Sequence, residues 1–140
     1  MSKEVLYYLD QLRTGSRGED AYHSLVELDD SYVPELVEAF YQEKSPKMQA
    51  LLVEVVGQHR LPETLTFLYE ALRHPHAEVW KSALDGIVAI GHPQGIKILA
   101  DGKARLQTLN DTIASERLEW IDEAYEQLQE RLQNGTSLTD

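Results

Sequence analysis

Five histidines are the side chains of this sequence best suited to bind a metal ion, and two of them, His74 and His76, flank a single proline. Zinc sites combine histidines with cysteines, carboxylates or further histidines at recurring spacings. The chain contains no cysteine and no H-E-x-x-H sequence, so a zinc site would need ligands from separate turns. We therefore expect the histidines to be structural residues of turns, with no metal and no cofactor bound.

Motifs for nucleophilic catalysis and phosphate binding are missing from the sequence as well. There is no G-x-S-x-G sequence, no cysteine to act as a nucleophile, and no glycine-rich phosphate loop. Carboxylate pairs, which serve in general acid–base catalysis, are plentiful, but a chain with 24 acidic residues brings some of them together by chance. The sequence predicts no catalytic residue and a protein that is not an enzyme.

The charge balance is strongly acidic, with 24 Asp and Glu against 13 Lys and Arg and a net charge of −11. Residues 18–43 contain eight acids and neither Lys nor Arg. Such a field repels phosphate backbones and anionic lipid and attracts basic molecules. We expect a basic protein as the partner, rather than nucleic acid or a membrane. The alternative is that the acids form only a solvated surface that aids solubility.

Length and composition favour one globular domain. The 140 residues include 42% hydrophobic and 26% charged ones, which are ordinary globular values, and no apolar run is long enough to span a membrane. Glu4 and Asp10 interrupt the first residues, so no secretory signal is expected there. The absence of cysteine fits a reducing compartment. Together these features favour a cytoplasmic protein.

Proline positions divide the chain into helical pairs. Pro34, Pro62 and Pro93 each stand where helical periodicity begins, at separations of 28 and 31 residues, and proline is well tolerated in the first turn of a helix. Pro46 and Pro75 follow the first two by 12 and 13 residues and mark a second helix start in each unit. No segment alternates as a strand would. The pattern predicts an all-α chain with helices over residues 3–13, 17–28, 34–44, 47–58, 62–73, 77–90, 93–109 and 112–133.

Glycines are placed where second helices end or approach a neighbour. Gly57 and Gly91 follow apolar helical stretches, which suits a left-handed C-terminal cap. Between residues 77 and 90, small residues at helical spacing, including Gly86, predict a close approach by another helix. The same segment has a stripe of apolar residues that predicts its buried face: Val79, Ala83, Ile87 and Ile90.

The last predicted helix has opposite apolar and acidic faces. Its apolar stripe contains Leu118, Ile121, Tyr125, Leu128 and Leu132, and its acidic stripe contains Glu116, Glu119, Glu123, Glu126 and Glu130. An end unit of a helical stack must be polar on its outer side, so we interpret residues 112–133 as a capping helix. Asn134 and the residues after it are expected to form a frayed tail over residues 134–140.

The stretch HPHAEVWKSALDGIVAIGHPQGI, residues 74–96, resembles a HEAT-like repeat of the kind found in phycobilisome-lyase-type proteins. The consensus second helix of that family is roughly D-x-x-x-x-V-R-x-x-A-x-x-A-L-x-x-I-G, and Val79, Ala83, Ile87, Ile90 and Gly91 occupy matching positions. The resemblance is clear for residues 61–92, fair for about 30–60, and weak in the outer pairs.

This resemblance implies a single domain over residues 1–140 that forms a short α-solenoid of about four antiparallel helix pairs, an armadillo-like superhelix. First helices would line its convex side and second helices its concave side. His74 and Trp80 stand where the family has Asp and Arg, so the Asp–Arg ladder between repeats is absent here and packing must replace it.

The concave side is the expected binding surface. A shift of 31 residues places Glu54 on Asp85, and aligning Ala83 with Ala124 places Asp85 on Glu126, so three successive second helices offer a carboxylate. Lys81 can pair with Asp85 one turn away. Aromatic anchors dominate many interfaces, although core filling is their alternative role. The predicted partner-binding residues are Glu54, Trp80, Lys81, Asp85, Glu119, Trp120, Glu123, Glu126, Asp29, Asp30 and Tyr32.

Small acidic proteins of this kind resemble bacterial immunity proteins, which neutralise a toxin nuclease by covering its basic cleft. That resemblance implies a non-enzymatic, monomeric toxin inhibitor. The HEAT-like resemblance also implies an enzyme alternative, a lyase or a metal-dependent enzyme, although the two-iron members of such folds use His-Glu dipeptides and this sequence has none. A general assembly scaffold is the third possibility.

Overall fold

The computed structural model describes residues 1–15, 17–109 and 112–139, and the regular secondary structure of these residues is helical, with no strand. The all-α prediction is therefore confirmed, and most helix ends lie within three residues of the predicted ones. Two short 3₁₀ turns, η1 (Asp30–Tyr32) and η2 (Pro62–Thr64), precede α3 and α5. The α-helices are α1 (Lys3–Thr14), α2 (Gly18–Glu27), α3 (Val33–Gln42), α4 (Pro46–Gln58), α5 (Leu65–Ala71), α6 (Ala77–Ile90), α7 (Gln94–Gln107) and α8 (Thr112–Thr139).

Local sequence explains where the helices start and stop. Ser45 caps α4, because its Oγ accepts a hydrogen bond from the Met48 N–H at 3.4 Å, and Pro46 follows in the first turn. Gly91 ends α6 with φ 66°, as predicted. The predicted capping role of Gly57 is wrong, because Gly57 lies inside α4 and the left-handed residue after this helix is Arg60, with φ 57°.

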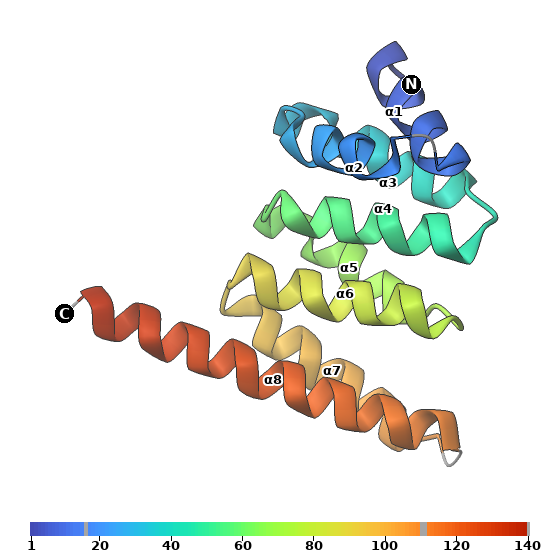
Figure 1. Ribbon diagram of the computed structural model, residues 1–140. Coiled ribbons are helices and arrows are strands. Elements are labelled where there is room, and N and C mark those ends of the chain that lie inside the picture. The colour runs from blue at the N-terminus through green and yellow to red at the C-terminus, as the bar shows by residue number, and fades with distance from the viewer. Residues whose placement is uncertain (16, 110–111, 140) are drawn as a thin grey trace.

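The helices form two layers (Figure 1). Each odd-numbered helix packs against the helix that follows it, and α2, α4, α6 and α8 contact one another in series. We call these four helices the front layer, and α3, α5 and α7, which lie behind them, the rear layer. The contact between α4 and α6 is the most extensive in the molecule. One continuous series of helix pairs therefore runs from the N-terminus to α8.

The core lies between neighbouring helices along the whole series. Every helix contributes at least one side chain of no more than 1% exposure, and each such aliphatic side chain stabilises the fold by about 1.5–3 kcal/mol relative to an exposed one. These side chains are Val5, Leu25, Leu36, Leu52, Leu68, Ile87, Leu99, Ile121 and Leu128. The predicted buried face of α6 is largely confirmed, since Val79, Ala83 and Ile87 have no exposed surface.

Two glycines explain how α4 and α6 pack so closely. A Cβ atom placed on Gly57 would lie 2.7 Å from the Cα atom of Gly86. A Cβ atom placed on Gly86 would lie 3.1 Å from Cδ1 of Leu68. The close approach predicted for Gly86 is confirmed, and Gly57 serves the same contact from the other helix.

Arginine side chains tie the last helix pair to the units before it. The final carbonyl groups of a helix have no partner within that helix and carry a partial negative charge, so cations are favourable there. Guanidinium groups from α7 and α8 donate hydrogen bonds of 2.6–3.2 Å to carbonyls at the ends of α5 and α6 and in the turn between these two helices. The pairs are Arg105 with Leu72, Arg117 with His74 and Pro75, and Arg131 with Val88.

The last helix is longer than predicted. The α8 backbone continues to Thr139, past the predicted end near residue 133, so the frayed tail expected from residue 134 is wrong as far as residue 139. Asp140, the last residue of that expected tail, lies outside the described residues. A glycine inside a helix costs only about 1 kcal/mol, so Gly135 does not have to end α8. Glu119, Glu123 and Glu126 are exposed along this helix, as a polar end face requires.

Candidate functional site

The centre of the candidate site is a pair of carboxyl groups on neighbouring front-layer helices, Glu54 of α4 and Asp85 of α6. Burial raises the pKa of the Asp85 carboxyl above its ordinary value, and the negative charge of Glu54 raises this pKa further. Lys81, one turn earlier on α6, acts in the opposite direction. Asp85 is exposed and Glu54 is half-buried on the front layer, and the negative charge of Glu54 acts on Asp85 across the two helices.

Tyr22 connects this pair to α2. Its hydroxyl group donates a hydrogen bond of 2.8 Å to Oε1 of Glu54. Burial, this hydrogen bond and the charge of Glu54 all raise the pKa of Tyr22, so the hydroxyl keeps its proton. Three successive front-layer helices thus contribute to one polar cluster, which holds Glu54 in a fixed position beside Asp85.

A groove of about 290 Å³ continues the site between α6 and α8. Its lining residues are Lys81, Leu84, Asp85, Trp120, Glu123, Ala124 and Gln127. Nζ of Lys81 lies 4.2 Å from the centroid of the Trp120 ring, within the range of a cation–π interaction. The groove therefore combines carboxylates with a half-buried indole ring, and the only lining cation of the described residues is already placed on that ring.

Trp80 does not belong to this surface, so its predicted role in partner binding is wrong. Its side chain is 1% exposed, and Nε1–H donates a hydrogen bond of 2.6 Å to the Leu72 carbonyl oxygen. The Arg117 guanidinium covers its ring at 5.4 Å from the centroid, and Trp120 lies at 6.0 Å. Trp80 is a core residue that has a polar partner for its indole N–H group.

The carboxylate that α8 places beside Asp85 is Glu123. The predicted alignment placed Glu126 there, but Glu126 is not a lining residue of the groove. Glu126 follows Glu123 by three residues, which is about 60° short of a full helical turn. Its side chain is therefore rotated about the helix axis by that angle and directed away from α6. Glu119 is also exposed on α8 outside the groove lining.

The structure separates the remaining predicted residues from this cluster. Asp29, Asp30 and Tyr32 lie at the turn between α2 and α3 rather than on the exposed sides of α4, α6 and α8. Asp29 accepts a hydrogen bond of 2.9 Å from the Ser31 N–H, which lowers the pKa of its carboxyl group. Asp30 contacts Nδ1 of His59 at 2.8 Å. These acids have local structural partners.

Sequence reasoning missed part of the site near α1 and α2. A second hollow of about 530 Å³ lies beside Glu54, and its lining includes Glu19, Tyr22, His23, Lys47 and Leu51. Tyr22 precedes Glu54 by 32 residues, close to the 28- and 31-residue spacings of the prolines. That spacing was the available signal, and it would have added α2 to the predicted surface.

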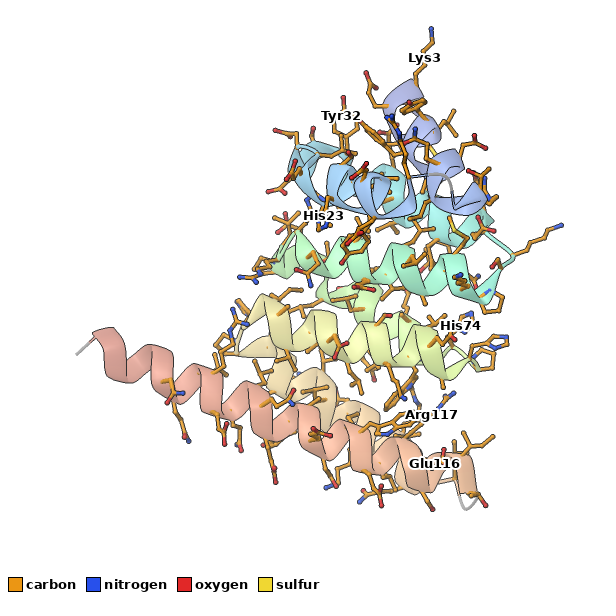
Figure 2. The ribbon with its side chains drawn as sticks, viewed as in Figure 1. Lys3, His23, Tyr32, His74, Glu116 and Arg117 are labelled. Atoms are coloured by element: carbon orange, nitrogen blue, oxygen red, sulfur yellow. The ribbon has the colours of Figure 1, made fainter. Side chains whose placement is uncertain are left out.

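The histidines are engaged in turns and between helices. Nδ1 of His74 accepts the His76 N–H, and Nδ1 of His92 accepts the Gln94 N–H. Figure 2 shows His74 near Arg117, which also contacts the His74 carbonyl. His59 places Nε2 at 3.0 Å from the Leu25 carbonyl oxygen. Across residues 1–15, 17–109 and 112–139, no three His, Cys, Asp or Glu side chains form a group that could hold a metal ion.

The chemistry that this arrangement supports is the binding of cations. Neighbouring carboxyl groups, one of them with a raised pKa as Asp85 has, also occur at general acid–base sites. Here, however, Asp85 is exposed and Glu54 is held by Tyr22, so both present acceptor oxygens at the surface. Lys and Arg side chains of a partner would form charge-assisted hydrogen bonds with them.

No protein-family model, curated protein or solved structure matches the chain. The HEAT-like resemblance accordingly remains a prediction from the sequence. Along the described residues, no helix combines the length and the apolar character that crossing a bilayer requires.

Proposed function

We propose that the protein is a short HEAT-like α-solenoid that binds a basic protein through its front layer and has no enzymatic activity. The observation that carries this proposal is the placement of Glu54, Asp85 and Glu123 on three successive front-layer helices, next to the exposed face of Trp120. Like charges held together weaken a fold, so this arrangement is one that a role in binding would explain. A basic partner would relieve their repulsion.

The most specific form of this proposal is a cytoplasmic immunity protein that covers the active cleft of a basic, nuclease-like toxin. A nuclease cleft is positive because it binds phosphates, and an acidic surface can occupy it in their place. The net charge of −11 would steer the two proteins together. Association rates would then exceed the neutral range of about 10⁵–10⁶ M⁻¹s⁻¹ and would fall as salt is added.

The first experiment identifies the partner and tests the surface together. Tagged wild-type protein and a Glu54→Lys/Asp85→Lys/Glu123→Lys variant are used to capture proteins from cells of the source organism. The control variant Glu4→Lys/Asp10→Lys/Asp101→Lys has the same change in net charge at exposed residues outside the groove lining. A protein retained by wild type and control but lost from the first variant is the expected partner.

Affinity measurements then decide whether the surface itself makes the contact. We expect calorimetric titration of the purified partner to show a large loss of affinity for the Glu54, Asp85 and Glu123 variant and a small one for the control. If both variants lost the same amount of affinity for the partner, net charge alone would explain the binding and the proposed surface would not be the contact. If the partner is a nuclease, its activity should fall in proportion to the complex formed, whereas a scaffold would leave that activity unchanged.

The enzyme alternative has its own readout. Metal analysis and a visible absorption spectrum of protein purified from its native cells test for a bound metal or a tetrapyrrole. A stoichiometric metal or a visible band would favour the lyase or metal-dependent enzyme, and it would count against a purely binding role.

A further inference from the structure

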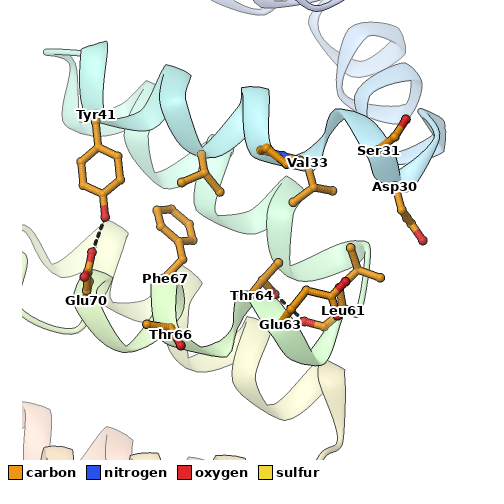
Figure 3. A pocket seen from close by; sticks show the side chains of 12 residues that line it. Asp30, Ser31, Val33, Tyr41, Leu61, Glu63, Thr64, Thr66, Phe67 and Glu70 are labelled. Carbon is orange, nitrogen blue, oxygen red and sulfur yellow. Dashed lines mark hydrogen bonds between the residues drawn. The ribbon is translucent and has the colours of Figure 1, made fainter.

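A separate groove lies in the rear layer, between α3 and α5 (Figure 3). Its volume is about 500 Å³, within the usual range for ligand sites. Apolar side chains form much of its lining, among them Val33, Val37, Leu61 and Phe67. It faces away from the Glu54–Asp85 cluster, because α3 and α5 lie behind α4 and α6.

Neighbouring helices pack more closely in the front layer than at this groove. Gly57 and Gly86 let the backbones of α4 and α6 approach until no Cβ atom fits between them. The rear-layer helices α3 and α5 meet through larger side chains, such as Tyr41 and Phe67, whose ring centroids are 6.0 Å apart. The groove is lined by α3 and α5 together with η1, η2 and the adjoining Leu61.

Both ends of the groove are acidic. At one end, the Tyr41 hydroxyl group donates a hydrogen bond to Glu70, which fixes the carboxylate at the rim (Figure 3). Toward the other end, the exposed Glu63 and Asp30 line the groove from opposite sides, and the Asp30 carboxylate contacts His59. No Lys or Arg is found among the described residues that line the groove. An occupant would meet an apolar floor between two negative ends.

The dimensions restrict what such an occupant can be. The groove follows η1 and α3 from Asp30 to Tyr41, which at about 1.5 Å per residue corresponds to roughly 17 Å, or about three helical turns. An amphipathic helix presents apolar side chains at i, i+3, i+4 and i+7 over that length, and it binds grooves of this kind. We propose that the groove binds an amphipathic helix of another protein, with its apolar stripe on Val37 and Phe67 and its Lys or Arg residues at Glu63 and Glu70.

This second site is independent of the function proposed for the front layer. It uses different helices and different carboxylates, and its floor is apolar where the front-layer groove is largely polar. Either proposal can be wrong without affecting the other. The experiment therefore uses the full chain and keeps the front-layer residues as a control.

The test probe is a fluorescent helical peptide of about three turns, with leucines at i, i+3, i+4 and i+7 and lysines at both ends. Fluorescence anisotropy should show saturable binding to the wild-type chain. A second peptide with glutamates in place of the lysines should not bind. Thr66, an exposed lining residue of α5, provides the blocking variant, because Thr66→Arg adds bulk and a positive charge without touching the core.

We expect Thr66→Arg and Glu63→Lys/Glu70→Lys each to lower the affinity for the lysine peptide at least about tenfold. Glu54→Lys/Glu123→Lys should change this affinity by less than about threefold. Circular dichroism checks that each variant is folded. Absence of saturable binding to wild type would overturn the proposal. So would unchanged affinity in Thr66→Arg, or a loss confined to the front-layer variant, which would place the peptide on the front layer instead.

Discussion

Gly57 of α4 and Gly86 of α6 face each other where the two helices pack, and a Cβ atom on Gly57 would stand 2.7 Å from the Cα atom of Gly86. We expect Gly57→Ala to destabilise the protein by about 1–3 kcal/mol, because the added methyl group meets backbone that cannot rotate away. Helix propensity alone predicts the opposite sign, a gain of about 1 kcal/mol. Urea unfolding followed by circular dichroism measures the difference.

The matched control is Gly18→Ala, at the start of α2. A Cβ atom on Gly18 meets no atom within 4 Å, so this substitution should be neutral or slightly stabilising. If the Gly57→Ala protein were as stable as Gly18→Ala, α4 and α6 could move apart without lowering the free energy of unfolding, which would contradict this prediction.

Asp85 is expected to weaken the fold at neutral pH. Because burial and Glu54 raise the pKa of Asp85 above 3.8, the folded protein holds this proton more tightly than the unfolded chain does. The contribution of Asp85 to stability is therefore greatest at low pH and decreases as pH rises through the raised pKa. We expect Asp85→Asn to unfold at a higher urea concentration than wild type at pH 7. The difference between the two urea midpoints should decrease as pH falls. Asp101→Asn, an exposed acid on α7, should show no such difference.

Combining this result with binding separates a functional residue from a structural one. If the proposed function holds, Asp85→Asn is more stable and yet binds the basic partner less tightly. A variant that is less stable than wild type at pH 7 would contradict the assigned repulsion between Asp85 and Glu54.

The two tryptophans should behave differently. Trp80→Phe removes the hydrogen bond to the Leu72 carbonyl, and we expect a loss of about 1–3 kcal/mol in the free energy of unfolding. Trp120→Phe should lower the free energy of unfolding by less, because Trp120 is half-buried at the surface groove. The chain has two tryptophans, so each variant isolates the emission of the other one. Acrylamide should quench Trp120 readily and Trp80 weakly; equal quenching would refute the buried position of Trp80.

His59 should be essential for joining the first helix pair to the second. Its side chain is 1% exposed and contacts both the Leu25 carbonyl oxygen and Asp30. His59→Ala leaves the carbonyl without this partner, which should lower the free energy of unfolding by about 1–3 kcal/mol. Hydrogen exchange should accelerate at η1. His23→Ala, at an exposed position of α2, serves as the control and should stay within about 0.5 kcal/mol of wild type.

The helices could be predicted because their signals are local. Prolines in first turns, Ser45 at an N-terminal cap and Gly91 at a C-terminal cap act through neighbouring backbone groups alone. Even the close approach at Gly86 follows from a stripe of small residues within one helix. The partner of that approach, Gly57, was interpreted as a cap, because one sequence does not reveal which helix a small residue faces.

The site was harder to predict because it depends on how helices pack. The buried residues of α4 and α6 meet helices on more than one side, so periodicity does not show which neighbouring helix each buried side chain contacts. Trp80 and Trp120 are the same residue type, but helix packing buries Trp80, whose N–H finds the Leu72 carbonyl, and leaves Trp120 half-buried. Similarly, the packing of α8 on α6 replaces Glu126 with Glu123 beside Asp85.

The arginine contacts leave the charge balance of the protein unchanged, and this balance has a consequence in concentrated solution. Arg105, Arg117 and Arg131 donate hydrogen bonds to neutral carbonyl groups and keep their positive charges, and the 24 acidic residues still exceed the 13 Lys and Arg residues, which gives a net charge of −11. Two copies approaching each other should behave as like-charged colloidal particles. Their osmotic second virial coefficient should be positive in dilute buffer and should decrease once added salt shortens the screening length to about 10 Å at 0.1 M.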